Sequence, residues 1–309
     1  MLRDKLTLEE LAFFKNQGYL IVEDLLNLEL CGQIKDLLWS ELPEHVSLVR
    51  DDPRTHIGPF NQAEADADAN HLRQGFHWRL RKVAGHPLLK RLVFAKNLVQ
   101  IAEQFLGQGM VHRPTAETSE LDATKSHTGI RGVYCVLPYG DYRSDRTGFH
   151  TDGHPFHLGM VAALDDIEER GAGFRVWPGS HKRFYPTFAL QYDQPRIPSY
   201  DHLPSVNGIY HPPAFLEESK RVLAEVTPVD CSCPAGSVVY WHHRVGHGNG
   251  PNYSERIRAA VLADYSKTDL DACRAAQPHA DMWHDWGDQI KTVSAGYSSA
   301  FARRQRLSQ

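Results

Sequence analysis

The chain has 309 residues, of which 41% are hydrophobic and 23% charged, and its formal net charge is −4. This composition is typical of a globular protein with a buried core, and without a basic stripe we expect no nucleic-acid partner. No apolar run reaches membrane-spanning length and the charged N-terminus lacks a signal-peptide core, so we expect no membrane partner and a cytoplasmic protein. Five scattered cysteines indicate reduced thiols rather than a disulfide framework.

The N-terminal segment predicts a helix followed by a strand. Thr7 and Glu10 have the spacing of a capping box ahead of an amphipathic run, so a helix is expected to begin there. Gly18 is expected to end it. The apolar, β-branched run over residues 19–22 then predicts a short strand.

Two further helices are expected before residue 107. One covers about residues 28–42, with Asn27 as its N-cap. The other runs from Pro87 to Leu106, with proline in its first turn and glycine after its last residue. Residues 43–75 between them contain proline, glycine and polar residues and predict a long loop, which in a compact domain is often functional.

Short β-like runs separated by turn residues replace the helices from about residue 110. They favour an antiparallel β-sandwich or barrel, and they lie at residues 129–137, 157–164, 173–177, 237–241 and 258–263. Residues 187–225 are proline-containing and predict a loop-rich insertion, and Trp283 and Trp286 are expected in a short helix of the polar tail. We therefore predict one domain over residues 1–309, with a helical layer at about 1–107, a β core at about 110–265 and a C-terminal extension at 266–309.

The segment FHTDGHPFH contains a candidate metal site. His150 and Asp152 are two positions apart, so on an extended backbone both project from the same face and can bind one ion. His247, in GHGNGPN, is the candidate third ligand. Two histidines and one carboxylate on one face of an octahedron leave positions open for a co-substrate and O2, which is typical of non-heme Fe(II) oxygenases.

An open iron site needs an electron source, and 2-oxoglutarate can chelate iron and present a second carboxylate. A buried carboxylate requires a cation, preferably the bidentate guanidinium of an arginine. Arg256 and Arg258 follow His247 across a turn. Because they are two residues apart they face the same side, and their spacing alone does not choose between them.

The chain resembles the phytanoyl-CoA dioxygenase (PhyH-like) family of Fe(II)/2-oxoglutarate-dependent oxygenases. The resemblance covers most of the chain and includes the helix and Gly-Tyr strand at its start. Its landmarks occur in order: His150-Thr-Asp152, then WPGSH at 177–181, PAGSVVYW at 234–241, HGNGPN at 247–252, and Arg258 eleven residues after His247. The family usually has Asp in the turn where this chain has Ser237, a difference that affects a turn rather than the metal ligands.

The resemblance implies a fold and a reaction. The expected fold is mainly β, a double-stranded β-helix (jelly roll, cupin-like) core with flanking helices. The expected enzyme is a dioxygenase that uses Fe(II), 2-oxoglutarate and O2, releases succinate and CO2, and hydroxylates or otherwise oxidises a C–H bond. Arg258 is the residue expected to hold the far carboxylate of 2-oxoglutarate. Because Asp152 is present, hydroxylation or another oxidation is favoured over halogenation, for which related enzymes replace this acid.

The expected substrate is a small, anionic metabolite. By the same resemblance Arg131 occupies a position that faces the substrate pocket, and an arginine there suggests a carboxylate or phosphate-like group. The aromatic or polar side chains near the metal motif are candidate pocket walls: Tyr134, Phe149, His154 and Phe156.

Two alternatives share the same predicted fold. A jelly roll can also be a cupin-like isomerase or a metal-binding protein without catalysis, because a fold does not determine a function. Arg258 distinguishes them on paper, since neither alternative needs a buried cation at that position.

Overall fold

A computed structural model describes residues 2–113, 129–143, 148–152, 156–192, 213–273 and 276–307. Within these ranges, none of the helices combines the length and the apolar character needed to span a membrane.

The N-terminal elements follow the sequence prediction closely. Helix α1 (Leu8–Gln17) begins with the capping box, in which the Thr7 hydroxyl accepts from Glu10 N and the Glu10 carboxylate accepts from Thr7 N. Gly18 ends it in the left-handed conformation, with φ of 79°. Strand β1 (Tyr19–Val22) follows directly, and α2 (Leu28–Ser40) is capped by the Asn27 side chain. These local signals were confirmed because each depends only on neighbouring residues.

Seven antiparallel strands form the large sheet. Their spatial order is β1, β8 (Val238–His242), β5 (Leu158–Ala163), β10 (Arg258–Tyr265), β4 (Ile130–Val136), β3 (His77–Leu80) and β2 (His71–Gln74). A small sheet has the order β7 (Val229–Cys231), β6 (Phe174–Val176) and β9 (His247–Asn249). The five predicted runs all became strands. The mainly β, cupin-like fold is confirmed.

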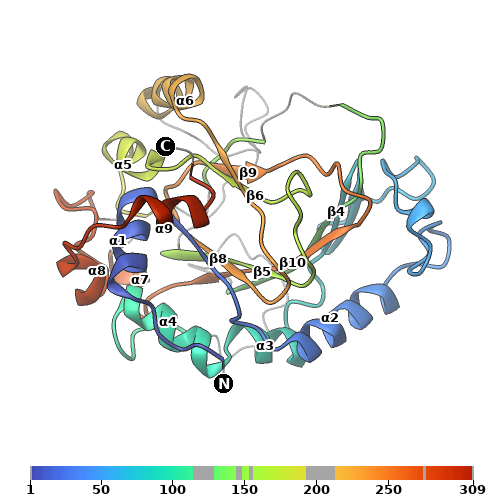
Figure 1. The fold of residues 1–309 in the computed structure, drawn as a ribbon, viewed down its shortest axis with the longest axis horizontal. Coiled ribbons are helices and arrows are strands. Elements are labelled where there is room, and N and C mark those ends of the chain that lie inside the picture. The colour runs from blue at the N-terminus through green and yellow to red at the C-terminus, as the bar shows by residue number, and fades with distance from the viewer. Residues whose placement is uncertain are drawn as a thin grey trace.

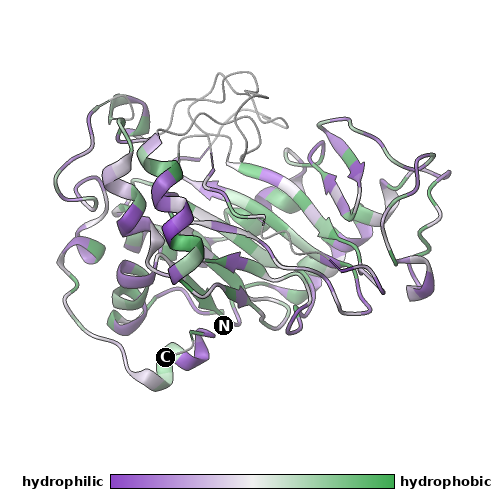
Figure 2. Ribbon diagram, turned by 90° about the horizontal axis from the view of Figure 1, so that it is seen from above, coloured by the Kyte–Doolittle hydropathy of each residue, from purple (hydrophilic) through white to green (hydrophobic). Residues whose placement is uncertain are grey.

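Helices cover one side of the large sheet and the small sheet lies on the other. Figure 1 shows α2, α3 (Pro87–Val93) and α4 (Lys96–Leu106) below the large sheet, with β6 and β9 above it. In Figure 2 the strands of the large sheet are mostly hydrophobic, whereas the helices alternate hydrophobic and hydrophilic residues. Apolar faces of helices and strands therefore meet in one continuous core.

Some boundaries differ from the prediction. The helix expected from Pro87 to Leu106 is two helices, interrupted at Phe94 and Ala95. Strands β2 and β3 form a hairpin at the end of the region predicted as helical and loop-like, and they extend the large sheet beyond β4. Part of the predicted loop-rich insertion is helix α6 (Pro213–Glu225). Trp283 and Trp286 lie in turns before α8 (Asp288–Thr292) instead of in a helix.

The remaining helices are short and lie in the segment between α2 and β2, after β6, and in the tail. They are η1 (Pro53–Thr55), α5 (Ser180–Phe184), η2 (Tyr185–Thr187), α7 (Leu270–Cys273) and α9 (Ser299–Arg304). Residues 1–107 thus supply three strands of the large sheet as well as helices, while the predicted domain boundaries remain a prediction.

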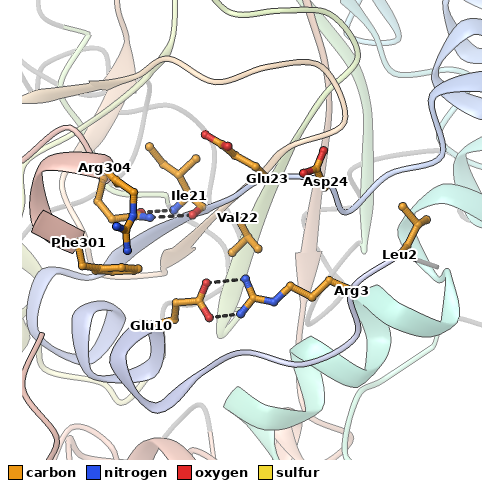
Figure 3. A pocket seen from close by; sticks show the side chains of 10 residues that line it. Leu2, Arg3, Glu10, Ile21, Val22, Glu23, Asp24, Phe301 and Arg304 are labelled. Carbon is orange, nitrogen blue, oxygen red and sulfur yellow. Dashed lines mark hydrogen bonds and ion pairs between the residues drawn. The ribbon is translucent and has the colours of Figure 1, made fainter.

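The open edge of the large sheet at β1 is capped by a side chain of the tail. Gln305 accepts from Ile21 N at 2.6 Å and donates to Ile21 O at 2.9 Å, as a neighbouring strand would. A surface pocket lies beside this edge, with the Arg3–Glu10 ion pair in its wall (Figure 3). Gln305 therefore satisfies the backbone groups of Ile21 that would otherwise be open to pairing with another strand.

Buried histidines make stability depend on pH. His71 accepts from Trp78 Nε1 at 3.0 Å, and burial, with nearby Arg73 and Lys82, lowers the pKa of His71 to about 4. Because this folded-state pKa is below the unfolded value of about 6.5, the stabilisation is complete above pH 6.5 and is lost as pH falls toward 4. The unfolding free energy of the wild type should fall between pH 7.5 and pH 5. In His71→Gln this fall should be smaller by about 1–2 kcal/mol, because the variant has no imidazole to protonate. Urea denaturation at both pH values measures this, and an unchanged pH dependence would contradict it.

Candidate functional site

Two of the three candidate ligands are held opposite each other by backbone pairing. His150 N donates to His247 O and His247 N donates to His150 O, both at 2.9 Å. This antiparallel bridge places the two imidazoles on the same side of the backbone, with ring centroids 4.4 Å apart. Asp152, two residues after His150, points to the same side. The structure therefore brings together the three residues that the sequence predicted.

The ligand atoms of these side chains converge. Asp152 Oδ2 is 3.4 Å from His247 Nε2, and Asp152 Oδ1 is 4.0 Å from His150 Nε2. Each Nδ1 lies near a carbonyl, His150 at 2.7 Å from Gly148 O and His247 at 3.0 Å from Val245 O. A carbonyl only accepts, so each Nδ1 carries the proton and each Nε2 keeps a lone pair for a metal.

The site fits a divalent iron ion by chemistry and spacing. Two ligands at about 2.1 Å from one ion and at right angles are roughly 3 Å apart, close to the observed separations. Burial and the neighbouring His247 lower the pKa of His150 to about 4, so its imidazole is neutral, as metal binding requires. The donor set of two imidazoles and one carboxylate is the one that iron oxygenases use.

The turn at residues 177–181 fixes the segment that carries His247. Gly246 N donates to the Ser180 hydroxyl at 2.8 Å, and Trp177 N donates to Gly246 O at 2.9 Å. The His181 imidazole lies 3.2 Å from Lys15 O in α1. In the sequence this motif was only a landmark of the family resemblance. In the structure it connects the segment that carries His247 to helix α1.

Burial distinguishes the two candidate arginines. Arg256 is exposed, whereas Arg258 is only 5% exposed and contacts β4 of the large sheet and β9 of the small sheet. Arg258 donates to Ala172 O at 3.0 Å, Tyr134 O at 3.2 Å and Asn249 Oδ1 at 2.9 Å. Within the described ranges it forms no ion pair with a carboxylate, and burial lowers its pKa to about 10. A buried guanidinium bound only to neutral acceptors is suited to receive an anion.

Asn249 and Phe174 are site residues that the sequence analysis missed. Asn249 is two residues after His247 on β9, so the strand directs both side chains to one face and links the metal ligand to Arg258. Phe174 stacks on the His247 ring at a centroid distance of 5.2 Å. The alternation of side chains along a strand could have indicated that Asn249 lies on the same face as His247. Phe174 lies on a different strand, so no local pattern reveals its contact.

Arg131 contacts the metal-ligand carboxylate. Its NH2 group lies 2.9 Å from Asp152 Oδ2 and 2.6 Å from Asp264 Oδ1. Burial opposes its charge, but the two carboxylates hold the pKa of Arg131 above its usual value. The prediction that Arg131 offers a free cation to the substrate therefore lacks support, because two carboxylates already neutralise it.

The predicted aromatic pocket walls lie in different environments. Tyr134 is on the Arg258 face of β4, with its hydroxyl accepting from Arg81 Nε at 2.8 Å. Phe156 is buried beside Arg131, whose guanidinium carbon is 5.2 Å from the ring centroid. Phe149 packs against Trp177 and Phe184, in a separate aromatic cluster. The Phe149 ring also lies against Gly246, which precedes the ligand His247, so Phe149 stays a candidate wall. His154 lies outside the described residues.

Another group with metal-binding side chains occurs in the tail. His279, His284 and Asp285 have ligand atoms within 4.8 Å of one another, but His284 is exposed and His279 is partly exposed. Neither this group nor the pocket beside β1 includes a predicted ligand. The group at His150 is distinguished by the nearby Arg258, which binds Asn249 on the same strand as His247.

Solved structures with the same fold include a protein described as alpha-ketoglutarate-dependent and one that contains bound iron. The chain matches the non-heme alpha-ketoglutarate-dependent carbocyclase SnoK from nogalamycin biosynthesis with 16% identity and a TM-score of 0.52, over 91% of this chain and 97% of that one. It matches EctD from S. alaskensis with bound Fe with 15% identity and a TM-score of 0.52, over 88% and 80% of the two chains. At these identities the likeness establishes the fold. No curated protein matches the chain.

The family model for phytanoyl-CoA dioxygenase (PhyH) matches residues 14–260, which include all three ligands and Arg258. Enzymes of this family use iron and 2-oxoglutarate, and the donor set at His150, Asp152 and His247 fits the iron. The resemblance seen in the sequence is confirmed: the chain belongs to the phytanoyl-CoA dioxygenase (PhyH) family.

Proposed function

We propose that this protein is an Fe(II)- and 2-oxoglutarate-dependent dioxygenase that hydroxylates, or otherwise oxidises, a C–H bond of a small metabolite. In the proposed site His150, Asp152 and His247 hold the iron and Arg258 binds the C5 carboxylate of 2-oxoglutarate. The observation that carries the proposal is the position of Arg258, a buried cation joined to the ligand strand through Asn249.

Each residue has a defined task in this proposal. When bound, the iron would activate O2, which is the oxidant, and 2-oxoglutarate would supply two electrons as it is converted to succinate and CO2. The two Nδ1–carbonyl contacts fix the imidazole orientations, so no reorganisation is needed when the metal binds. Arg258 lies in a buried environment, where its attraction for a carboxylate is stronger than in water.

The alternatives of a cupin-like isomerase and a non-catalytic metal-binding protein have no specific support. Neither explains why a guanidinium is buried with only neutral partners near the ligand strand. Burying such a group costs free energy unless an anion compensates it. The reaction outcome is a separate question, because the similar fold of SnoK belongs to an enzyme described as a carbocyclase. Because Asp152 completes the ligand set, we propose hydroxylation or another oxidation rather than halogenation.

The charge of the substrate is not set by Arg131. The predicted anionic substrate depended on that residue, and its guanidinium is bound to Asp152 and Asp264. An anionic substrate therefore stays a prediction without a cation assigned to it. Tyr134 and Phe156 remain candidate contacts, since each adjoins Arg258 or Arg131.

Substrate-stimulated succinate release tests the proposed function. The purified protein is supplied with Fe(II), 2-oxoglutarate and O2, together with a panel of neutral and anionic small metabolites. We expect a slow background release of succinate that a true substrate accelerates, and mass spectrometry of that substrate should show addition of one oxygen atom. Absence of succinate, together with failure of 2-oxoglutarate to bind the Fe(II)-loaded protein, would contradict the proposal. Loss of two hydrogen atoms without oxygen would identify desaturation or ring closure instead.

A further inference from the structure

We propose that Arg131 is a positioning residue for the metal ligand Asp152, and that Asp264 holds Arg131 in place for this task. The inference rests on the proposed function, in which Asp152 binds iron. It also replaces the predicted role of Arg131 as a receptor for the substrate.

The three side chains form one hydrogen-bonded unit. Arg131 NH1 and NH2 donate to Asp152 Oδ1 and Oδ2 at 3.3 and 2.9 Å. Arg131 Nε and NH2 donate to Asp264 Oδ2 and Oδ1 at 2.9 and 2.6 Å. Two neighbouring edges of the planar guanidinium are therefore each used by a carboxylate, which is the geometry that lysine cannot reproduce.

A bulge in the large sheet directs Arg131 toward this unit. Leu262 of β10 pairs with Gly132 and the next residue, Ala263, pairs with Ile130, so Arg131 is an extra residue on β4. Gly132 has φ of 114°, and a Cβ there would lie 2.3 Å from Leu80 O. Only glycine fits this position, and the bulge redirects the side chain that precedes it.

Aromatic side chains exclude water from the unit. The guanidinium carbon of Arg131 lies 5.2 Å from the Phe156 ring centroid and 5.6 Å from that of Trp241. Arg131 is 7% exposed and Asp264 3% exposed. In such surroundings the hydrogen bonds are strong and their loss is costly.

The charges of the unit match its position beside a divalent ion. One guanidinium against two carboxylates leaves one negative charge. The positive charge of Arg131 is already compensated by Asp152 and Asp264, so it attracts an anionic substrate only weakly. Its hydrogen bonds to both oxygens of Asp152 restrict rotation of that carboxylate, so the ligand is oriented before the metal arrives.

Cobalt(II) binding measures this role without requiring turnover. The protein is titrated anaerobically with Co(II) alone, and both the affinity and the visible spectrum of the bound ion are recorded. We expect Arg131→Met and Asp264→Asn each to weaken Co(II) binding about 10- to 100-fold and to alter the spectrum, with Arg131→Lys less affected. Asp152→Ala defines the background from other sites, including the histidines of the tail.

Arg175→Met is the matched control. Arg175 binds Asp230 through Nε and NH2 at 2.6 and 2.8 Å, a similar ion pair on the small sheet. This variant should bind Co(II) within about twofold of the wild type while losing a comparable charge pair. Thermal unfolding verifies that each variant folds, and if Arg131→Met does not, Arg131→Lys and Asp264→Asn decide the matter.

The outcomes separate this inference from the proposed function. If Asp152→Ala abolishes Co(II) binding but Arg131→Met and Asp264→Asn leave it unchanged, the positioning role is wrong and the iron site stands. If those two variants bind Co(II) normally and Arg131→Met only raises the KM for a substrate, Arg131 is a substrate-binding residue. If Asp152→Ala binds Co(II) like the wild type, the assigned ligands themselves are wrong.

Discussion

Replacing Asp152 by alanine is expected to abolish Fe(II)-dependent succinate formation. The change removes the one anionic ligand among the three side chains and leaves Arg131 buried without one of its two carboxylates. We expect turnover to fall at least about 1000-fold. Mutating a residue that only hydrogen-bonds to a metal ligand already lowers metal affinity or activity about 10- to 100-fold, and Asp152 is itself a proposed ligand. Succinate quantified after incubation with Fe(II), 2-oxoglutarate and O2 measures the effect.

Asp230→Ala provides the control for this variant. It also removes a carboxylate bound to an arginine, but on the small sheet and without contact to the ligands. Its succinate formation should remain near that of the wild type. Succinate formation by Asp152→Ala at the wild-type rate would show that the carboxylate does not bind the iron.

Replacing Arg258 by alanine is expected to raise the 2-oxoglutarate concentration needed for half-maximal turnover. The variant removes a buried guanidinium that is held in place by two backbone carbonyls and the Asn249 side chain. Losing a charge-assisted bidentate contact in a buried site costs roughly 2–5 kcal/mol, which corresponds to about 30- to 4000-fold in affinity. Binding of 2-oxoglutarate to the Fe(II)-loaded protein, measured anaerobically by calorimetry, isolates this effect from catalysis.

Arg256→Ala is the natural comparison, because this arginine precedes Arg258 by two residues and is exposed. Its 2-oxoglutarate affinity should change by no more than about twofold, as is usual for an exposed charge. The opposite ranking, with Arg256→Ala impaired and Arg258→Ala unaffected, would transfer the co-substrate role to Arg256. A large loss in both variants would indicate that the turn between β9 and β10 controls binding.

The two arginines Arg131 and Arg258 illustrate how ion pairing decides what a buried cation does. Both are buried on the inner side of the large sheet and both lie near the ligand set. Arg131 is compensated by Asp152 and Asp264, whereas the acceptors of Arg258 are two carbonyls and an amide. Because a buried charge seeks a counter-charge, only Arg258 is suited to an incoming carboxylate.

The sequence by itself determined the local features of this protein. The capping box at Thr7, the strand over residues 19–22 and the shared face of His150 and Asp152 all depend on neighbours within a few residues. Those features follow from backbone periodicity and capping, which act within a single helix or strand. The sequence also offered His247 as the third ligand, and the family resemblance then chose Arg258 over Arg256, which spacing alone could not do.

The tertiary structure decided which distant groups meet. It paired His150 with His247 across an antiparallel bridge, buried Arg258 while leaving Arg256 outside, and used a bulge to direct Arg131 to Asp152 and Asp264. Arg131 and Asp264 are 133 positions apart in the sequence, so no pattern among neighbouring residues predicts their contact. Burial and ion pairing are properties of the assembled sheets, so the charge that a side chain offers to a ligand is fixed only after folding.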